Sequence, residues 1–153
     1  MEDVIWNSNW AWALPLIVCT VMLHVIALGG INAQVVTVLT RVHGHRRFMV
    51  LFVGVMGMTT LLATLLHGAE AVIWAYAYCA LGAMQDIRTA LIYSLSALTT
   101  YGHAELYLAR HWQLMGALEA LNGLLLFGLT TAFLYAHVRR VWIAAAGVGA
   151  HQI

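Results

Sequence analysis

A short polar stretch interrupts the apolar sequence at residues 99–105, where it reads Thr-Thr-Tyr-Gly-His-Ala-Glu. Backbone carbonyls and a threonine hydroxyl can replace the water around a partly dehydrated cation, and they trap it less strongly than carboxylates do. The residues expected to supply these oxygen atoms are Thr100, Tyr101, Gly102 and His103. Because bare backbone polar groups are costly in hydrocarbon, the stretch is predicted to line a water-filled path. The alternative is a buried interhelical turn.

His103 adds a titratable group to this stretch. An unperturbed imidazole titrates at about pH 6.5, so a ring of such side chains at the outer mouth would make external acid a regulator of cation entry. The same ring would suit a soft divalent ion. In the alternative arrangement, His103 packs behind the loop and hydrogen-bonds a neighbouring group.

Ionisable residues also fall within apolar segments, where they are costly and usually face a partner or water. His67 and Glu119 are expected at similar depths in two different segments, so one interpretation pairs them. In the other, Glu119 accepts a hydrogen bond from Ser94, Ser96 or Tyr93 and supports the polar stretch from behind. We favour this supporting role.

The last apolar segment contains three further candidates. Asn122 is expected to line a cavity, with an interhelical hydrogen bond as the alternative. Gly123 and Gly128 would let a helix bend at a gate, although small residues also permit close helix packing.

The composition explains where these residues must lie. The chain of 153 residues is 63% hydrophobic and 8% charged, with a mean hydropathy of +0.85, which favours a membrane protein over a soluble domain. Its net charge of +1 favours neither nucleic acid nor an acidic substrate. Cys19 and Cys79 fit no metal-ligand spacing and are expected to pack as apolar residues. We expect no enzymatic activity, no cofactor, no metal beyond permeating cations, and no soluble partner.

Three apolar segments, at about residues 12–39, 48–78 and 112–137, are long enough to cross a membrane. Pro15 is expected in the first turn of the first helix, where its missing N–H does no harm. Residues 84–98 are too few to cross and predict a re-entrant helix, with Asp86 near its positive end.

The basic residues predict the orientation of these segments. Five of the seven follow the first or the third segment and belong on the cytoplasmic side: Arg41, Arg46, Arg47, Arg139 and Arg140. This places the N-terminus outside the cell, the C-terminus in the cytoplasm and the chain in the cell membrane. Because one re-entrant loop cannot enclose an ion path, a closed ring of identical subunits is required, and four is the number we favour.

Residues 90–138 resemble the pore module of the potassium channel superfamily, which runs from a pore helix through a Thr-rich filter to an inner helix. Without a gap, five residues match the motif: the threonine pair Thr99 and Thr100, the first filter glycine Gly102, the acidic Glu105 and the inner-helix tryptophan Trp112. The resemblance covers about a third of the chain.

The resemblance implies an all-α membrane protein with three transmembrane helices, a re-entrant pore helix and a filter loop, assembled as a tetrameric channel. Residues 1–47 would hold the first helix and a cytoplasmic basic loop, residues 48–140 the pore module, and residues 141–153 a short tail. The implied function is passage of monovalent cations, K⁺ or Na⁺, through the bilayer. Thr99, Ala104 and Glu105 would support the filter or form its mouth.

Two residues depart from the family pattern. Tyr101 takes an aliphatic position, and Ala104 takes the position of the second filter glycine. If that position keeps a positive φ, alanine there is strained by roughly 1–2 kcal/mol per subunit. Potassium selectivity is therefore not implied.

Two other functions remain open. A channel-like protein that does not conduct could act as a scaffold or sensor. Alternatively, paired histidines could hold haem for electron transfer, with His24, His67 and His137 as candidates. The haem alternative is weaker because His137 is expected far in depth from His67, and because it leaves the polar stretch unexplained.

Overall fold

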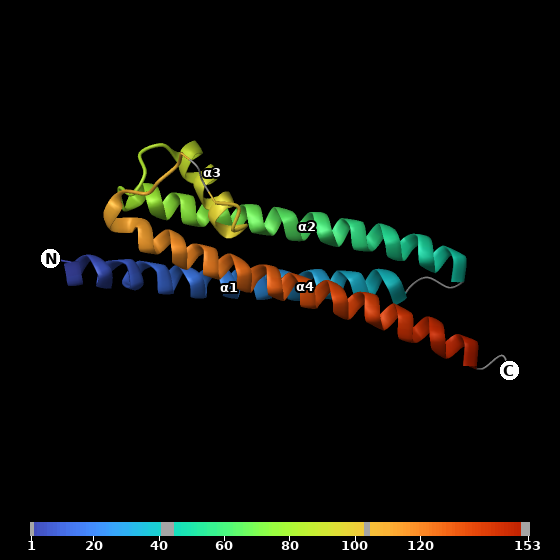
Figure 1. The fold of residues 1–153 in the computed structure, drawn as a ribbon. Helices are drawn as coiled ribbons and strands as arrows, with labels where there is room; N and C mark the ends of the chain where they lie inside the picture. Colours follow the sequence, from blue (N-terminus) through green and yellow to red (C-terminus); the bar gives the residue numbers. More distant parts are fainter. Residues whose placement is uncertain (1, 41–44, 103–104, 151–153) are drawn as a thin grey trace.

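The computed structural model describes residues 2–40, 45–102 and 105–150, which form helices and the turns and loops between them, with no strand among them (Figure 1). The elements are α1 (Glu2–Thr40), α2 (His45–Ala80), α3 (Ile87–Leu98), a 3₁₀ turn at Arg110–Trp112 and α4 (Gln113–Ala150). Three segments are long and apolar enough to cross a membrane, namely Trp6–Leu39, Met49–Ala80 and Arg110–Arg140. The predicted all-α class with three such helices is confirmed, and it indicates a membrane-embedded protein.

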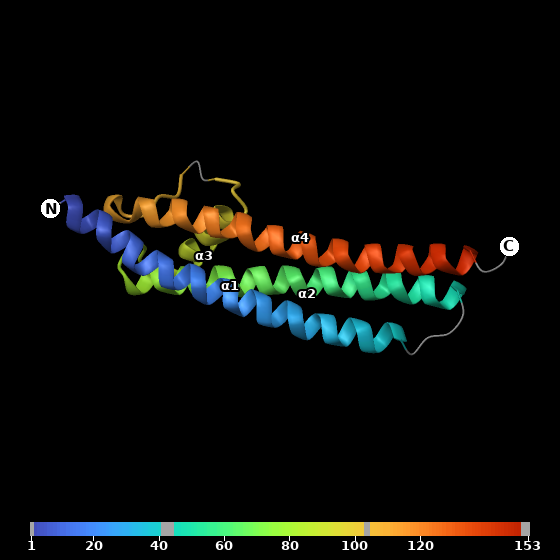
Figure 2. The same cartoon turned by 90° about the horizontal axis from the view of Figure 1, so that it is seen from below.

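The three long helices form one elongated bundle in which α1 and α4 run in the same direction and α2 runs in the opposite one (Figures 1 and 2). The short helix α3 packs on α2 and α4 at the end of the bundle where α4 begins. The start of α2 and the last turns of α4, the helix that contains Arg139 and Arg140, lie toward the other end. The predicted cytoplasmic residues that the structure describes therefore share one end of the bundle.

α1 begins at Glu2 rather than near residue 12, so the prediction that Pro15 lies in the first turn is wrong. Pro15 is inside the helix, where its ring removes the hydrogen bond that its N–H would make to Ala11. The preceding turns are held by Asn9, whose Nδ2 donates to the His111 carbonyl at 2.7 Å and whose Oδ1 accepts from the Met115 N–H at 2.9 Å. These bonds fasten the start of α1 to the start of α4.

α3 begins at Ile87, three residues after the predicted start, and ends at Leu98 as predicted. Asp86 is its N-cap, and Oδ2 accepts from the backbone N–H of Thr89 at 2.9 Å and from its hydroxyl at 2.7 Å. The hydrogen bonds from Thr89 hold the pKa of Asp86 below its ordinary value. The cap fixes the direction in which α3 enters the bundle.

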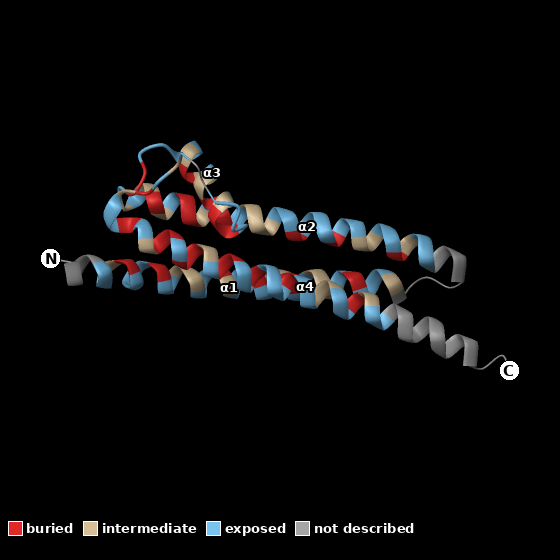
Figure 3. Cartoon of the chain, viewed as in Figure 1, coloured by how far each residue is buried: buried red, intermediate tan, exposed pale blue. Residues whose placement is uncertain are grey.

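Burial is concentrated at the end of the bundle that holds α3 (Figure 3). The core there contains Trp74 and Tyr78 of α2, Ala90 of α3 and Met115 of α4, all fully buried. Elsewhere the long helices expose large apolar side chains, such as Val50 at 73%. Such a surface suits contact with lipid or with other subunits.

Candidate functional site

The predicted polar loop begins at the C-terminal end of α3. The N–H of Tyr101 donates to the Ser96 carbonyl at 3.0 Å, and the N–H of Thr100 donates to the Ala97 carbonyl at 2.9 Å. This pattern is a Schellman cap, which requires a left-handed residue, and Thr100 has φ 57°. Gly102 also has a positive φ, 79°, which glycine adopts without strain.

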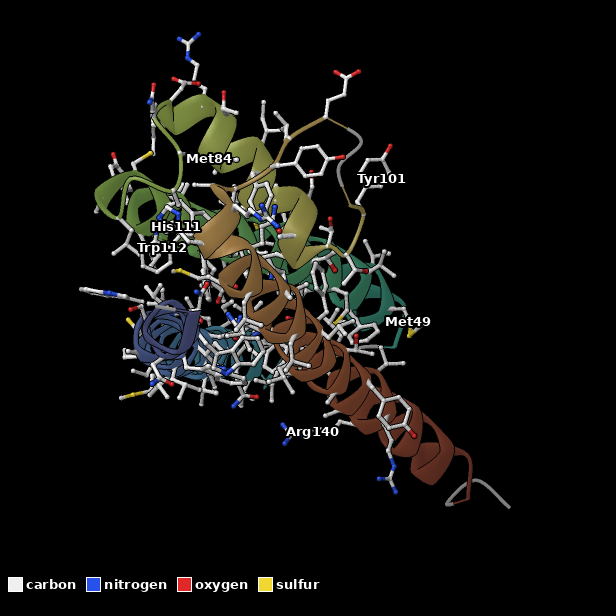
Figure 4. All side chains as sticks on the ribbon, turned by 60° about the vertical axis from the view of Figure 1, so that its left-hand side comes forward. Met49, Met84, Tyr101, His111, Trp112 and Arg140 are labelled. Atoms are coloured by element: carbon white, nitrogen blue, oxygen red, sulfur yellow. The ribbon has the colours of Figure 1, made fainter. Side chains whose placement is uncertain are left out.

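The loop is exposed in the single chain. Thr99, Thr100, Tyr101 and Gly102 are all exposed, and Tyr101, at 87%, points away from the helices (Figure 4). Among the described residues, no hydrogen bond uses the carbonyl oxygens of residues 99–102. Toward the described part of the chain, these oxygens are free to contact a ligand.

The mouth of the loop is described only in part. His103 and Ala104 lie outside the described residues, so their predicted roles stay predictions. Glu105 is exposed and lines a shallow hollow together with Asp86 and Thr89. It lies at the end of the bundle where α3 and α4 begin, which is compatible with a position at the mouth.

The C-terminal end of α3 lies deep against α4. Leu98 belongs to a buried cluster with Ala71 of α2 and Leu126 of α4. Gly123 makes this approach possible, because a Cβ at that position would collide with the backbone carbonyl of Leu98. Close packing is thus an observed role of Gly123, whereas bending at a gate stays a prediction. Gly128 has no atom within 4 Å of an added Cβ and plays no such packing role within the chain.

Glu119 supports α3 from behind. Its Oε2 accepts from the Tyr78 hydroxyl at 2.5 Å, and its Oε1 accepts from the Ser94 hydroxyl. Both oxygens are fully buried, so the carboxyl group joins α2, α3 and α4 in one polar contact. The expected hydrogen bond to Ser94 is present, while the alternative pairing of Glu119 with His67 is wrong.

Tyr93 packs beside this contact. Its ring meets that of Tyr78 edge to face, with centroids 5.5 Å apart. Gly116 of α4 leaves room for the Tyr93 hydroxyl, which would collide with a Cβ there. Neither Tyr78 nor Gly116 was predicted from the sequence. Tyr78 meets Glu119 only through the axial offset between α2 and α4, which side-chain packing sets.

Asn122 does not line a cavity, so that prediction is wrong. It is fully buried, and its Nδ2 donates to the Thr20 hydroxyl of α1 at 2.8 Å. The alternative prediction, a hydrogen bond between helices, is confirmed. The face of α4 that holds Asn122 is covered by α1, the helix that is additional to the two-helix pore module.

A second polar group lies farther along the bundle and is called here the histidine cluster: His24, His67, Glu70 and Thr130. Glu70 Oε1 lies 2.8 Å from His24 Nδ1, and Oε2 lies 3.1 Å from His67 Nδ1. Thr130 Oγ1 lies 3.0 Å from His24 Nε2 and 3.2 Å from His67 Nε2. The four side chains therefore form a closed ring of four contacts across α1, α2 and α4.

The histidine cluster can satisfy its hydrogen bonds without net charge. Four protons shared among the two imidazoles, the carboxyl group and the hydroxyl leave the cluster without net charge and supply one proton for each contact. Neutrality suits its burial, since an uncompensated charge in the membrane interior is costly. Phe127 covers His67, with stacked rings 4.2 Å apart.

The structure brings together two of the three histidines considered for haem. The rings of His24 and His67 lie 5.1 Å apart, too close for a porphyrin to fit between them. His137 is elsewhere, with Nδ1 2.9 Å from the Phe133 carbonyl. The geometry therefore gives no support to a haem held between paired histidines. Comparisons with protein-family models, curated proteins and solved structures find no match for this chain.

Proposed function

We propose that this protein assembles into a tetrameric channel for monovalent cations, with the loop after α3 lining the central path. The observation that carries the proposal is an exposed polar backbone at a depth where lipid would otherwise surround it.

The depth of the loop follows from its neighbours. Gly123, which touches Leu98, lies two residues from the middle of the Arg110–Arg140 segment, or about 3 Å along the helix. On α2, Leu98 packs against Ala71, nine residues inside the end of the Met49–Ala80 segment, or about 13 Å. Both helices thus put the end of α3 well inside a bilayer whose hydrocarbon core is about 30 Å thick.

An exposed loop at this depth needs water or protein around it. Its free carbonyls would each cost several kcal/mol in contact with lipid. Identical loops from neighbouring subunits around one axis would exclude lipid and leave water and cations at the centre. The partial negative charge at the C-terminal end of α3 would favour a cation at the same place.

The support of α3 is consistent with such a role. Its start is fixed by Asp86, its middle by the Ser94 contact to Glu119, and its end by close packing on Gly123. Preorganised carbonyls are what cation coordination requires. Four subunits are proposed from the resemblance to potassium channels. Potassium selectivity is not part of the proposal, because Tyr101 and Ala104 depart from that pattern.

Cross-linking tests whether the loops meet at an axis. Replace the free cysteines Cys19 and Cys79 by alanine, introduce Tyr101→Cys, and treat the protein in mild detergent with a short bis-maleimide reagent. We expect rapid cross-links between subunits, because four equivalent side chains would face one another. The control is Ile26→Cys on α1, which is 69% exposed and is expected to face lipid. A monomeric mass, or a rate no higher than that of the control, would rule the arrangement out.

A further inference from the structure

We propose that the histidine cluster binds a divalent transition-metal ion, with Nδ1 of His24, Nδ1 of His67 and a carboxylate oxygen of Glu70 as ligands. The ligands of the cluster are not residues of the loop, although the cluster lies only about one helical turn from the end of α3. Glu70 is next to Ala71, which packs with Leu98, and Thr130 is four residues past Leu126 of the same buried group. Because its ligands are not loop residues, the proposal does not depend on cation conduction.

The ligand atoms are already close to the spacing that a metal needs. One ligand atom from each of the three residues lies within 4.8 Å of the others. Each Nδ1 is 2.8 or 3.1 Å from its carboxylate oxygen, whereas ligands around tetrahedral Zn²⁺ are roughly 3.3 Å apart, given bonds of about 2.0–2.1 Å. The two contacts use different oxygens of Glu70 and would each have to lengthen by a few tenths of an ångström. The remaining spacings among the three ligand atoms, which are at most 4.8 Å, would have to close toward roughly 3.3 Å by rotation of the side chains.

Thr130 supplies the outer contacts that metal-bound imidazoles usually make. With Nδ1 on the metal, each Nε2 carries a proton and points to Thr130 Oγ1, at 3.0 Å for His24 and 3.2 Å for His67. A hydroxyl oxygen has two lone pairs and can accept both bonds. Such bonds fix the ring orientation and tautomer of metal-bound histidine.

The donor set selects a class of ion different from the permeating one. Two imidazoles and one carboxylate suit Zn²⁺, Co²⁺ or Ni²⁺, whereas K⁺ and Na⁺ would be expected at the oxygen atoms of the loop. The Glu70 carboxylate offsets half of the ion's charge. The His67 side chain is 12% exposed, whereas His24 and Glu70 are fully buried, so His67 is the ligand nearest to the surface of the bundle. The bound ion would fasten α1 to α2, and to α4 through Thr130.

Co²⁺ binding tests the site, because four-coordinate Co²⁺ has visible absorption bands that Zn²⁺ removes on displacement. The full-length protein in detergent is expected to bind one Co²⁺ per chain with these bands. His24→Gln should lose the bands, whereas His111→Gln, an exposed histidine outside the cluster, should keep them. Absence of the bands in the unmodified protein, or their persistence in folded His24→Gln, would overturn the proposal.

Thr130→Val gives a second test that leaves every ligand in place. Valine has nearly the shape of threonine but cannot accept the two Nε2–H bonds. The Co²⁺ affinity should fall about 10–100-fold, and Thr130→Ser should restore it. An affinity equal to that of the unmodified protein would contradict the proposed geometry, even if His24→Gln proves too unstable to purify.

Discussion

Replacing Glu119 by alanine is expected to release α3 from the bundle and to abolish cation flux. The Tyr78 and Ser94 hydroxyls both donate to this carboxyl group and would be left buried without an acceptor. Each unpaired donor costs about 1–3 kcal/mol, and a cavity adds to the loss. Thermal unfolding of the purified protein and flux from liposomes measure the two effects.

Two further variants separate the hydrogen bonds of Glu119 from its volume. Glu119→Gln keeps the shape and one acceptor oxygen, so we expect an intermediate loss of stability. Combining Glu119→Ala with Ser94→Ala should cost less than the sum of the single changes, because the two residues share one bond. Additive losses, or full flux in Glu119→Ala, would show that this contact does not hold the loop.

Gly123→Ala is expected to be the second most damaging single substitution. The added Cβ would meet the backbone carbonyl of Leu98, which cannot move aside as a flexible side chain can. The end of α3 must then move off α4, at a cost of about 1–3 kcal/mol for overpacking. Because the loop follows directly, conductance should fall as well. Unfolding temperature and single-channel conductance are the measurements.

Gly128→Ala is the matched control on the same helix. No atom lies within 4 Å of an added Cβ there, so the substitution should be neutral or slightly stabilising through helix propensity. If both alanine variants behave alike, close packing of Leu98 on Gly123 does not position the loop. If Gly128→Ala alone reduces conductance, the loss would favour a role of Gly128 in bending the helix.

Length and capping made α3 predictable from the sequence. Its twelve residues are too few to cross a membrane, and Asp86 precedes them as an N-cap. The hydrogen bond from Ser94 to Glu119 could also be predicted, because a carboxyl group buried in an apolar segment needs a donor nearby.

The axial offset between helices was not predictable, and it explains the wrong pairing of His67 with Glu119. Aligning the middles of the two predicted segments, at about residues 63 and 125, sets His67 level with Glu119. In the structure Tyr78 is level with Glu119, and His67 is level with Thr130. The difference is about ten residues, or about 15 Å along the helix. Segment length sets whether a helix can span, but side-chain packing sets its offset.

The packing position of α1 could not be predicted from the sequence either. Nothing in the apolar pattern shows which face of α4 it covers, so Asn122 was expected at a cavity when it bonds to Thr20. His24 and Glu70 are 46 residues apart in the sequence, and their side chains come into contact only because α1 packs against α2. Polar residues in lipid-facing segments signalled that partners exist, but not which ones.

Flux of monovalent cations from liposomes is the most direct test of the proposed function. Purified protein, shown to be tetrameric, is reconstituted with K⁺ or Na⁺ inside, and efflux is compared with that from protein-free vesicles. We predict protein-dependent flux that changes in conductance or selectivity in Thr100→Ala, whose hydroxyl and carbonyl belong to the exposed loop. The contradicting result is an absence of flux across a range of pH and voltage from vesicles that contain the folded tetramer, which would favour a non-conducting scaffold.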